Sequence, residues 1–201
     1  MKTKILEIKN LSFYYENLSV DNKWKQIIKN ITFEVNEGEI VGLVGLSGCG
    51  KTTLGKLLVD YFTLNNISYK MTGEINYSKK DRTIGIPSND YSKINIPPIQ
   101  MVFQDPRTSL NMKMPVYNQL KESILLKYKK NNINAINIDK DIKDLASKLK
   151  ISEKLLKYLP TDMSGGQRRR FGLAKIMAMD PKIIIADEPV ASLDVSIKEQ
   201  I

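Results

Sequence analysis

The sequence predicts an α/β fold built around a phosphate-binding loop, with antiparallel strands before the loop and a helical insertion after it. Three observations carry this prediction. Residues 45–52 match the pattern G-x-x-x-x-G-K-[ST], with an apolar run before them and apolar residues at helical spacing after them. A second apolar run, residues 183–186, ends at two adjacent acids. Between about residues 115 and 158, the apolar period is that of helices.

The segment before the loop is predicted to consist of strands. Residues 31–35 alternate apolar and polar side chains, and residues 36–38, Asn-Glu-Gly, are typical of a turn. Residues 39–44 are mostly apolar, as expected of a buried strand. We therefore expect antiparallel strands up to about residue 36 and then a buried strand that leads into the loop.

The loop itself has the residue types of a phosphate cradle. Its glycines free the backbone to wrap an anion, Lys51 can reach the terminal phosphates, and the Thr52 hydroxyl can ligate Mg²⁺. The helix predicted after the loop would direct its N-terminal amides at the phosphate. Its apolar face consists of Leu54, Leu57, Leu58 and Tyr61. A chance glycine-rich turn is the alternative, but the flanking pattern favours a nucleotide-binding loop.

The middle of the chain predicts loops, one short strand and helices. Residues 65–98 are polar and are expected to be mostly loop, with a candidate strand at 73–77, and residues 99–103 form another short strand. Two helical faces follow on either side of a connector at residues 131–134. They consist of Leu120, Ile124 and Tyr128, and of Ile142, Leu145, Leu149 and Leu156. We interpret these faces as core packing within a small helical subdomain.

Two acids follow the apolar run at residues 183–186. Asp187 is expected at the carboxyl end of a buried strand, where ligands collect in open α/β sheets, and it can hold the Mg²⁺ of Mg-ATP. Glu188 can orient and polarise an attacking water. A solvated loop is the alternative for two adjacent acids, and the apolar run before them argues against it.

Three further patterns are weaker when each is taken alone. Ser164, Gly165 and Gly166 precede a helix predicted over residues 171–179, so they offer an N-cap and exposed amides to an anion, although a plain helix cap fits equally well. Gln104 follows a strand and could contact a metal or a nucleophilic water, or simply be exposed. Residues 191–194 would by themselves be another helix cap.

Taken in order, these motifs resemble those of the ABC-type ATPases, over essentially the whole chain. Residues 45–52, Gln104, 164–167, 183–188 and 192–194 resemble the Walker A loop, Q-loop, signature motif, Walker B strand and D-loop. The resemblance implies an α/β P-loop NTPase core with an N-terminal antiparallel β subdomain and an inserted helical subdomain. The implied core covers about residues 1–104 and 162–201, and the implied helical subdomain covers about 105–161.

The same resemblance implies ATP and Mg²⁺ as cofactors and assigns roles to residues. Lys51, Gln104 and Glu188 are expected to act in catalysis, with Glu188 as the general base. Thr52, Gln104 and Asp187 are expected to hold Mg²⁺. The residues expected to contact nucleotide are Tyr15, Gly45, Ser47, Gly48, Cys49, Gly50, Lys51, Thr52, Thr53, Ser164, Gly165, Gly166, Gln167 and Asp194. Tyr15 would stack on adenine; the neighbouring Tyr14, or simple packing of a strand tyrosine, is the alternative.

Residues 102–111 and 186–196 are similar to the peptide/nickel importer branch of that family. This similarity implies a peripheral ATPase subunit at the cytoplasmic face of the membrane, paired head to tail with a second ATPase subunit. It would drive membrane permeases fed by an extracytoplasmic solute-binding protein. The alternatives are a soluble ABC ATPase acting on ribosomes or DNA, and a non-catalytic nucleotide-binding partner in a heterodimer.

Composition and one departure from the family pattern complete the sequence argument. The net charge of +9 comes largely from scattered lysines, and aromatic residues make up only 7%, so we expect no nucleic-acid partner. The single cysteine, Cys49, excludes an internal disulfide and fits a reducing compartment. The family's switch histidine would lie beyond the D-loop, and the sequence contains no histidine. We therefore expect a domain that is incomplete at its C-terminus. Without the histidine, we expect this chain to hydrolyse ATP slowly or not at all.

Overall fold

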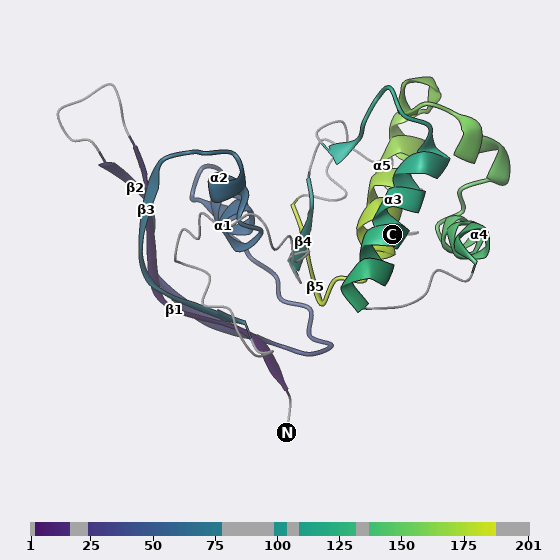
Figure 1. The fold of residues 1–201 in the computed structure, drawn as a ribbon. Helices are drawn as coiled ribbons and strands as arrows, with labels where there is room; N and C mark the ends of the chain where they lie inside the picture. Colours follow the sequence, from purple (N-terminus) through teal and green to yellow (C-terminus); the bar gives the residue numbers. More distant parts are fainter. Residues whose placement is uncertain (1–2, 17–23, 78–98, 104–108, 132–136, 188–201) are drawn as a thin grey trace. The chain divides into compact units, whose positions relative to one another are not determined.

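The computed structural model describes residues 3–16, 24–77, 99–103, 109–131 and 137–187. Residues 1–93 and 94–201 form two units, and each unit is described here by itself. The first unit contains a three-stranded sheet and two short helices, and the second contains a two-stranded sheet and several helices (Figure 1).

The sheet of the first unit is antiparallel throughout. Strand β1 (Lys4–Glu16) lies in the centre, between β2 (Trp24–Asn36) and β3 (Tyr69–Tyr77). Strands up to residue 36 were predicted and are confirmed, whereas β3 begins earlier than the predicted 73–77. The fully buried side chains of β1 are Leu6, Ile8, Leu11 and Phe13. The hydrophobic effect of burying this row favours one register of the sheet.

Two residues with left-handed backbone conformations lie where the pairing of β1 with β2 shifts register. Asn10 in β1 and Asn30 in β2 both adopt left-handed backbone conformations, with φ of 49° and 45°. The Asn10 N–H donates to the Thr32 hydroxyl at 2.9 Å, and the Asn30 N–H donates to the Ser12 hydroxyl at 3.0 Å. These side chains satisfy backbone groups at the register shifts, where the ladder is interrupted.

The prediction of a buried strand at residues 39–44 is wrong for this structure. The segment is irregular, and Ile40 and Val44 are 99% and 94% exposed. After β2, the Glu39 carboxylate accepts hydrogen bonds from the backbone and side-chain N–H groups of Asn36, at 2.8 and 2.9 Å. No strand of the described residues pairs with the segment. Apolar residues favour a buried strand only where neighbouring strands supply hydrogen-bond partners.

Two helices follow the loop and cover one face of the sheet (Figure 1). Helix α1 (Lys51–Leu58) buries Leu54, Leu57 and Leu58, as its predicted apolar face requires. Tyr61 does not extend this face, because it begins a separate helix, α2 (Tyr61–Leu64). Phe62 of α2 is buried, with its ring centroid 4.9 Å from that of Phe13 in β1. This contact helps to hold the helices on the sheet.

In the second unit, β4 (Ile99–Val102) and β5 (Ile183–Ala186) pair in parallel. Both strands were predicted and both are present, but the prediction that β5 is buried is wrong: its residues are half-buried or exposed, and Ile184 is 46% exposed. Among the described strands, only β4 pairs with it. The helical elements are α3 (Val116–Asn131), α4 (Ile138–Lys148), the 3₁₀ helices η2 (Glu153–Lys157) and η3 (Pro160–Asp162), and α5 (Gly165–Ala178). The predicted helical block between residues 115 and 158 is therefore confirmed, and α5 begins earlier than the predicted residue 171.

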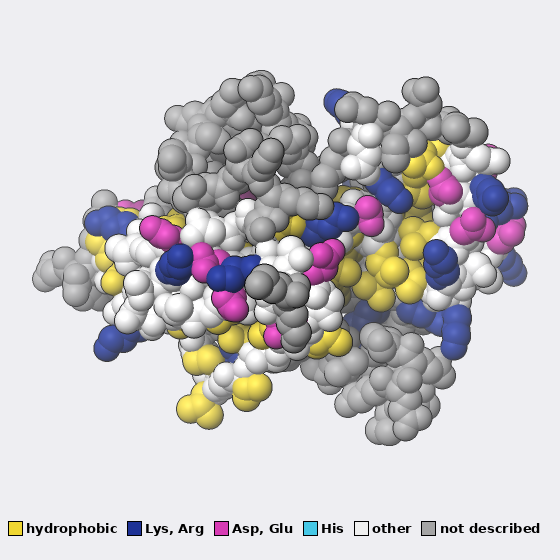
Figure 2. All heavy atoms as spheres, turned by 90° about the horizontal axis from the view of Figure 1, so that it is seen from below, with side chains coloured by type: hydrophobic (Ala, Val, Ile, Leu, Met, Phe, Trp, Pro, Cys, Tyr) yellow, Lys and Arg dark blue, Asp and Glu magenta, His cyan; other side chains and the backbone are white. Residues whose placement is uncertain are grey.

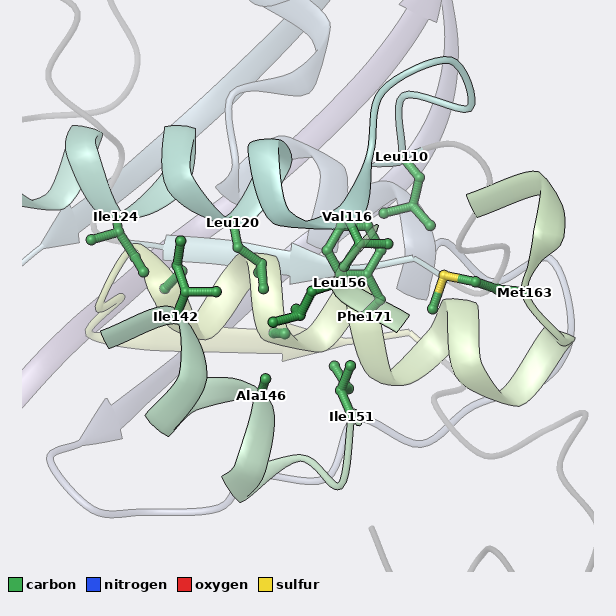
Figure 3. Close-up of a cluster of buried hydrophobic side chains, with 12 residues drawn as sticks. Leu110, Val116, Leu120, Ile124, Ile142, Ala146, Ile151, Leu156, Met163 and Phe171 are labelled. Carbon is green, nitrogen blue, oxygen red and sulfur yellow. The ribbon is translucent and has the colours of Figure 1, made fainter. Parts of the chain in front are cut away.

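The helices enclose one hydrophobic cluster (Figure 3). Of the residues predicted to form apolar faces, Leu120, Ile124, Ile142 and Leu156 are buried in it, and Tyr128, Leu145 and Leu149 pack at its edge. Phe171, which is fully buried, contributes α5 to the same cluster. The interpretation of these leucines and isoleucines as core is confirmed.

The surface is mixed in character. Figure 2 shows acidic and basic side chains interspersed over the visible face, with hydrophobic side chains also reaching the surface. Among the described residues, no helix has the length and apolar character needed to cross a bilayer.

Candidate nucleotide site

The loop at residues 45–50 ends in backbone geometry suited to an anion. Gly48 and Gly50 have φ of 79° and 100°, a region that side chains with a Cβ rarely adopt. Gly50 is the N-cap of α1, with no side-chain cap and no acidic residue in the first turn. Because no side chain caps the first turn of α1, its amides and the helix dipole favour a negatively charged ligand.

Lys51 lies folded over this loop. Its ammonium donates to the carbonyl oxygens of Gly45 and Leu46, at 2.8 and 2.9 Å, and lies 3.8 Å from the Cys49 sulfur. A cation held by neutral carbonyls gains a stronger partner when a phosphate oxygen reaches it. The Lys51 contacts and the amides at the start of α1 together fit the phosphates of a nucleotide.

Close packing sets the shape of the loop. A Cβ on Gly45 would lie 2.7 Å from the Cys49 sulfur, and a Cβ on Gly50 would lie 3.2 Å from Ile27. The end of the loop therefore lies directly on β2. The sequence pattern marks these glycines as backbone ligands for phosphate, but it does not reveal that Gly50 also needs to be small against the sheet.

Tyr15 in β1 is connected to the same helix. Its ring packs edge-on against Phe13 and Phe62, with centroids 5.0 and 5.3 Å apart, and its hydroxyl is hydrogen-bonded to Thr53. Burial raises the pKa of the Tyr15 hydroxyl, and the Thr53 hydrogen bond opposes that shift. The structure thus brings two of the predicted site residues together at the start of α1. The residue is partly exposed, which is compatible with the predicted adenine contact.

In the second unit, Ser164 begins α5 with a complete capping box. The Gln167 N–H donates to the Ser164 hydroxyl at 3.2 Å, and the Ser164 N–H donates to the Gln167 side-chain oxygen at 2.8 Å. Ser164 was predicted to be an N-cap, which is confirmed. The reciprocal role of Gln167 was missed, although the spacing Ser-x-x-Gln is a signal for it.

Gly165 and Gly166 form the first turn of α5 rather than preceding it. Neither glycine would meet any atom within 4 Å if it carried a Cβ, and neither has a positive φ. Glycine at these positions costs about 0.5–1 kcal/mol relative to alanine, because it loses more backbone freedom on folding. Among the described residues of this unit, nothing requires either position to be a glycine.

The predicted metal-binding end of the unit lies where β4 and β5 stop together. Val102 pairs with Ala186, and the Asp187 N–H donates to the Val102 carbonyl at 3.1 Å. Asp187 therefore follows the carboxyl end of a strand, as predicted, although that strand is not buried as the prediction required. Gln104, Glu188 and Asp194 lie outside the described residues.

One contact was not anticipated from the sequence. Lys175 of α5 donates from its ammonium to the Ser109 carbonyl at 2.8 Å, across 66 residues of sequence. The sequence does carry a signal for this contact. Lys175 is the single lysine among the small and apolar residues of α5 between Phe171 and Ala178.

Comparison with known protein families gives one clear match. A family model described as ABC transporter matches residues 28–191. The chain is 36% identical to the oligopeptide transport ATP-binding protein OppF of Streptococcus mutans over 100% of the chain and 61% of that protein. It is 35% identical to the dipeptide transport ATP-binding protein DppF of Lactococcus lactis subsp. cremoris, over 98% of the chain and 60% of that protein. The chain thus spans about three fifths of the length of these relatives.

Solved structures support the fold. The dimeric structure of MJ0796, described as a bacterial ABC transporter cassette, matches with a TM-score of 0.73 and 24% identity. The match covers 98% of this chain and 79% of that one. A post-hydrolysis state of the same cassette, bound to ADP and Pi, matches with a TM-score of 0.74 and 24% identity over the same shares. The α/β P-loop ATPase fold predicted from the sequence is confirmed.

Proposed function

The chain belongs to the ABC transporter family, and on that premise we propose that it is the ATP-binding and ATP-hydrolysing part of a subunit that energises a peptide importer. The sterically open Gly165–Gly166 turn, in which Gly165 is exposed and Gly166 is half-buried, is the observation that carries this proposal. It supplies a second helix end suited to an anion, besides the loop before α1, and a Cβ on either glycine would meet no atom of the described residues within 4 Å. Similarity to OppF and DppF supports oligopeptides or dipeptides as the transported class, and nickel-type complexes are the alternative.

In the proposed mechanism, each residue does one task. Mg-ATP supplies the phosphoanhydride bond that is hydrolysed. Lys51 exchanges its loop carbonyls for phosphate oxygens, and the amides at the start of α1 bind the remaining charge. Thr52, Gln104 and Asp187 would hold the Mg²⁺ ion, which would neutralise charge on the phosphates. Glu188 accepts a proton from the attacking water.

The proposed working unit is a head-to-tail pair of ATPase subunits. The loop before α1 in one subunit and the start of α5 in the other bind the same nucleotide, so ATP joins the subunits and hydrolysis releases them. The first turn of α5 presents Ser164, Gly165 and Gly166, of which Ser164 and Gly165 are exposed. The solved cassette of similar fold is described as dimeric, which supports a pair of subunits.

The proposed dimer predicts an unusual response to Gly166→Ala. Because a Cβ at Gly166 meets open space within the unit, the variant is expected to unfold at the same temperature or slightly above the wild type. Its ATP-dependent dimer is expected to weaken at least roughly tenfold, since the added methyl would displace the partner's nucleotide. Sedimentation in the presence of ATP, in a Glu188→Gln background, measures the dimer, and thermal unfolding is the control. Full dimerisation of the alanine variant would contradict the proposed interface.

The importer assignment predicts the partners of the full-length protein. We expect it to work at the cytoplasmic face of the membrane with permease subunits that receive their solute from an extracytoplasmic binding protein. Affinity purification from detergent-extracted membranes of the native host is expected to recover two permease subunits, identified by mass spectrometry. Recovery with ribosomes in a sucrose gradient, without permeases, would instead support the soluble ABC alternative.

A further inference from the structure

The first unit contains two hydrogen-bonded pairs of threonine and tyrosine at one aromatic cluster. Tyr15 of β1 and Tyr69 of β3 are cross-strand partners, and the Tyr69 ring stacks on that of Phe13, with centroids 5.5 Å apart. The Tyr69 hydroxyl forms a hydrogen bond with the Thr63 hydroxyl of α2, at 3.1 Å. The Tyr15 hydroxyl forms its hydrogen bond with Thr53 of α1. Each pair thus connects a strand of the sheet to one of the two helices.

The surroundings of the two pairs differ in charge. Thr53 lies in the first turn of α1, two residues after Lys51, where no side chain caps the amides and the helix dipole favours a phosphate. Thr63 lies in the four-residue α2, which follows the acidic Asp60. Of these two pairs, only Thr53 and Tyr15 therefore lie at a helix end that is suited to an anion.

Three contacts fix the orientation of the Tyr15 ring. The ring is edge-on to Phe13 and to Phe62, at interplanar angles of 89° and 79°. The hydrogen bond to Thr53 restrains the far end of the side chain, which a change of rotamer would move furthest. Because Tyr15 is also partly exposed, its ring is held ready for a planar ligand and loses little side-chain freedom on binding one.

We infer that Thr53 is a positioning residue that holds the Tyr15 ring in the orientation in which it stacks on the base of the nucleotide. The inference rests on the proposed function and on the predicted contact between Tyr15 and adenine. Thr53 thereby joins two parts of one ligand site, the first turn of α1 that binds phosphate and the strand residue that binds the base. Without the Thr53 hydroxyl, Tyr15 adopts other rotamers in the free protein, and binding of the base has to order it.

The test measures how tightly the full-length subunit binds ADP, which carries a base, and inorganic pyrophosphate, which carries none. Competition with a fluorescent ATP analogue gives both affinities, and ADP avoids hydrolysis during the measurement. Thr53→Val keeps the side-chain shape and removes the hydroxyl. We expect this variant to bind ADP roughly three- to tenfold more weakly than wild type, the effect of ordering one large side chain. Its affinity for pyrophosphate is expected to stay within twofold of wild type, because Lys51 and the first-turn amides are unchanged.

Two control variants separate positioning from packing. Thr53→Ser keeps a hydroxyl at the same place, and Thr63→Val removes the matched hydroxyl that bonds Tyr69. Both are expected to bind ADP within twofold of wild type. Tyr15→Phe keeps the ring and removes the other end of the hydrogen bond, so it is expected to match Thr53→Val. The double variant is expected to lose no more than either single variant, because both changes remove one interaction.

Several outcomes would overturn the inference. Equal weakening of ADP and pyrophosphate binding in Thr53→Val would show that Thr53 acts on phosphate instead. An ADP affinity within twofold of wild type, an equal loss in Thr63→Val, or additive losses in the double variant would also contradict it. If Thr53→Val does not fold, Thr53→Ala takes its place with the same expected loss. A wild type that binds ADP no better than pyrophosphate would overturn this inference alone, whereas a wild type that binds neither would count against the proposed function.

Discussion

Replacing Glu188 by glutamine is expected to lower ATP turnover by roughly 10²–10⁴-fold while leaving ATP affinity close to that of wild type. Glutamine has the shape of glutamate and can still contact a water, but it cannot accept the proton that the water must lose. ATP would therefore stay bound, and the subunits would stay joined. Phosphate release gives the turnover, and equilibrium binding of a fluorescent ATP analogue gives the affinity.

The matched control for this variant is Glu153→Gln. Glu153 is an exposed carboxylate of η2 that pairs only with Lys143 among the ion pairs of the described residues. Exposed ion pairs contribute little, so this change is expected to leave turnover and affinity unaltered. If Glu188→Gln hydrolyses ATP at the wild-type rate, Glu188 is not the general base.

Replacing Gly73 by alanine is expected to lower the free energy of unfolding by about 4 kcal/mol. Gly73 lies in β3 with φ of 90°, which strains any residue with a Cβ. An alanine Cβ would also lie 2.4 Å from the Asn10 carbonyl oxygen and 2.5 Å from that of Lys9. Both atoms belong to the backbone of β1, at the register shift between β1 and β3, so neither can move without disturbing the central strand.

Gly38→Ala separates the two causes of this loss. Gly38 also has a positive φ, 70°, but its Cβ would meet no atom within 4 Å. Only backbone strain remains, and the expected loss is about 1 kcal/mol. Urea unfolding of both variants measures the difference. Equal midpoints for the two variants would show that β1 can yield to the Gly73 Cβ.

Local patterns predicted much of the fold and of the candidate site. The antiparallel strands before residue 36 and the helices around Leu120 and Ile142 were predicted from apolar periodicity, and β4 and β5 were predicted as strands from short apolar runs. Their parallel pairing was not predicted. The order and spacing of the motifs predicted the family, since each motif needs particular residue types for its contacts. The roles of Gln104, Glu188 and Asp194 stay predictions.

The amino-acid sequence by itself determined the elements whose cause is local: the Ser164 cap, the glycine-rich loop before α1, and the apolar faces that build the helical core. Only the tertiary structure decided the features that depend on hydrogen bonds between segments far apart in the sequence. Residues 39–44 have the composition of a buried strand but no described strand pairs with them, and Lys175 meets the Ser109 carbonyl 66 residues away. Hydrogen bonds between distant segments depend on where the chain places both partners, and no local pattern records that placement.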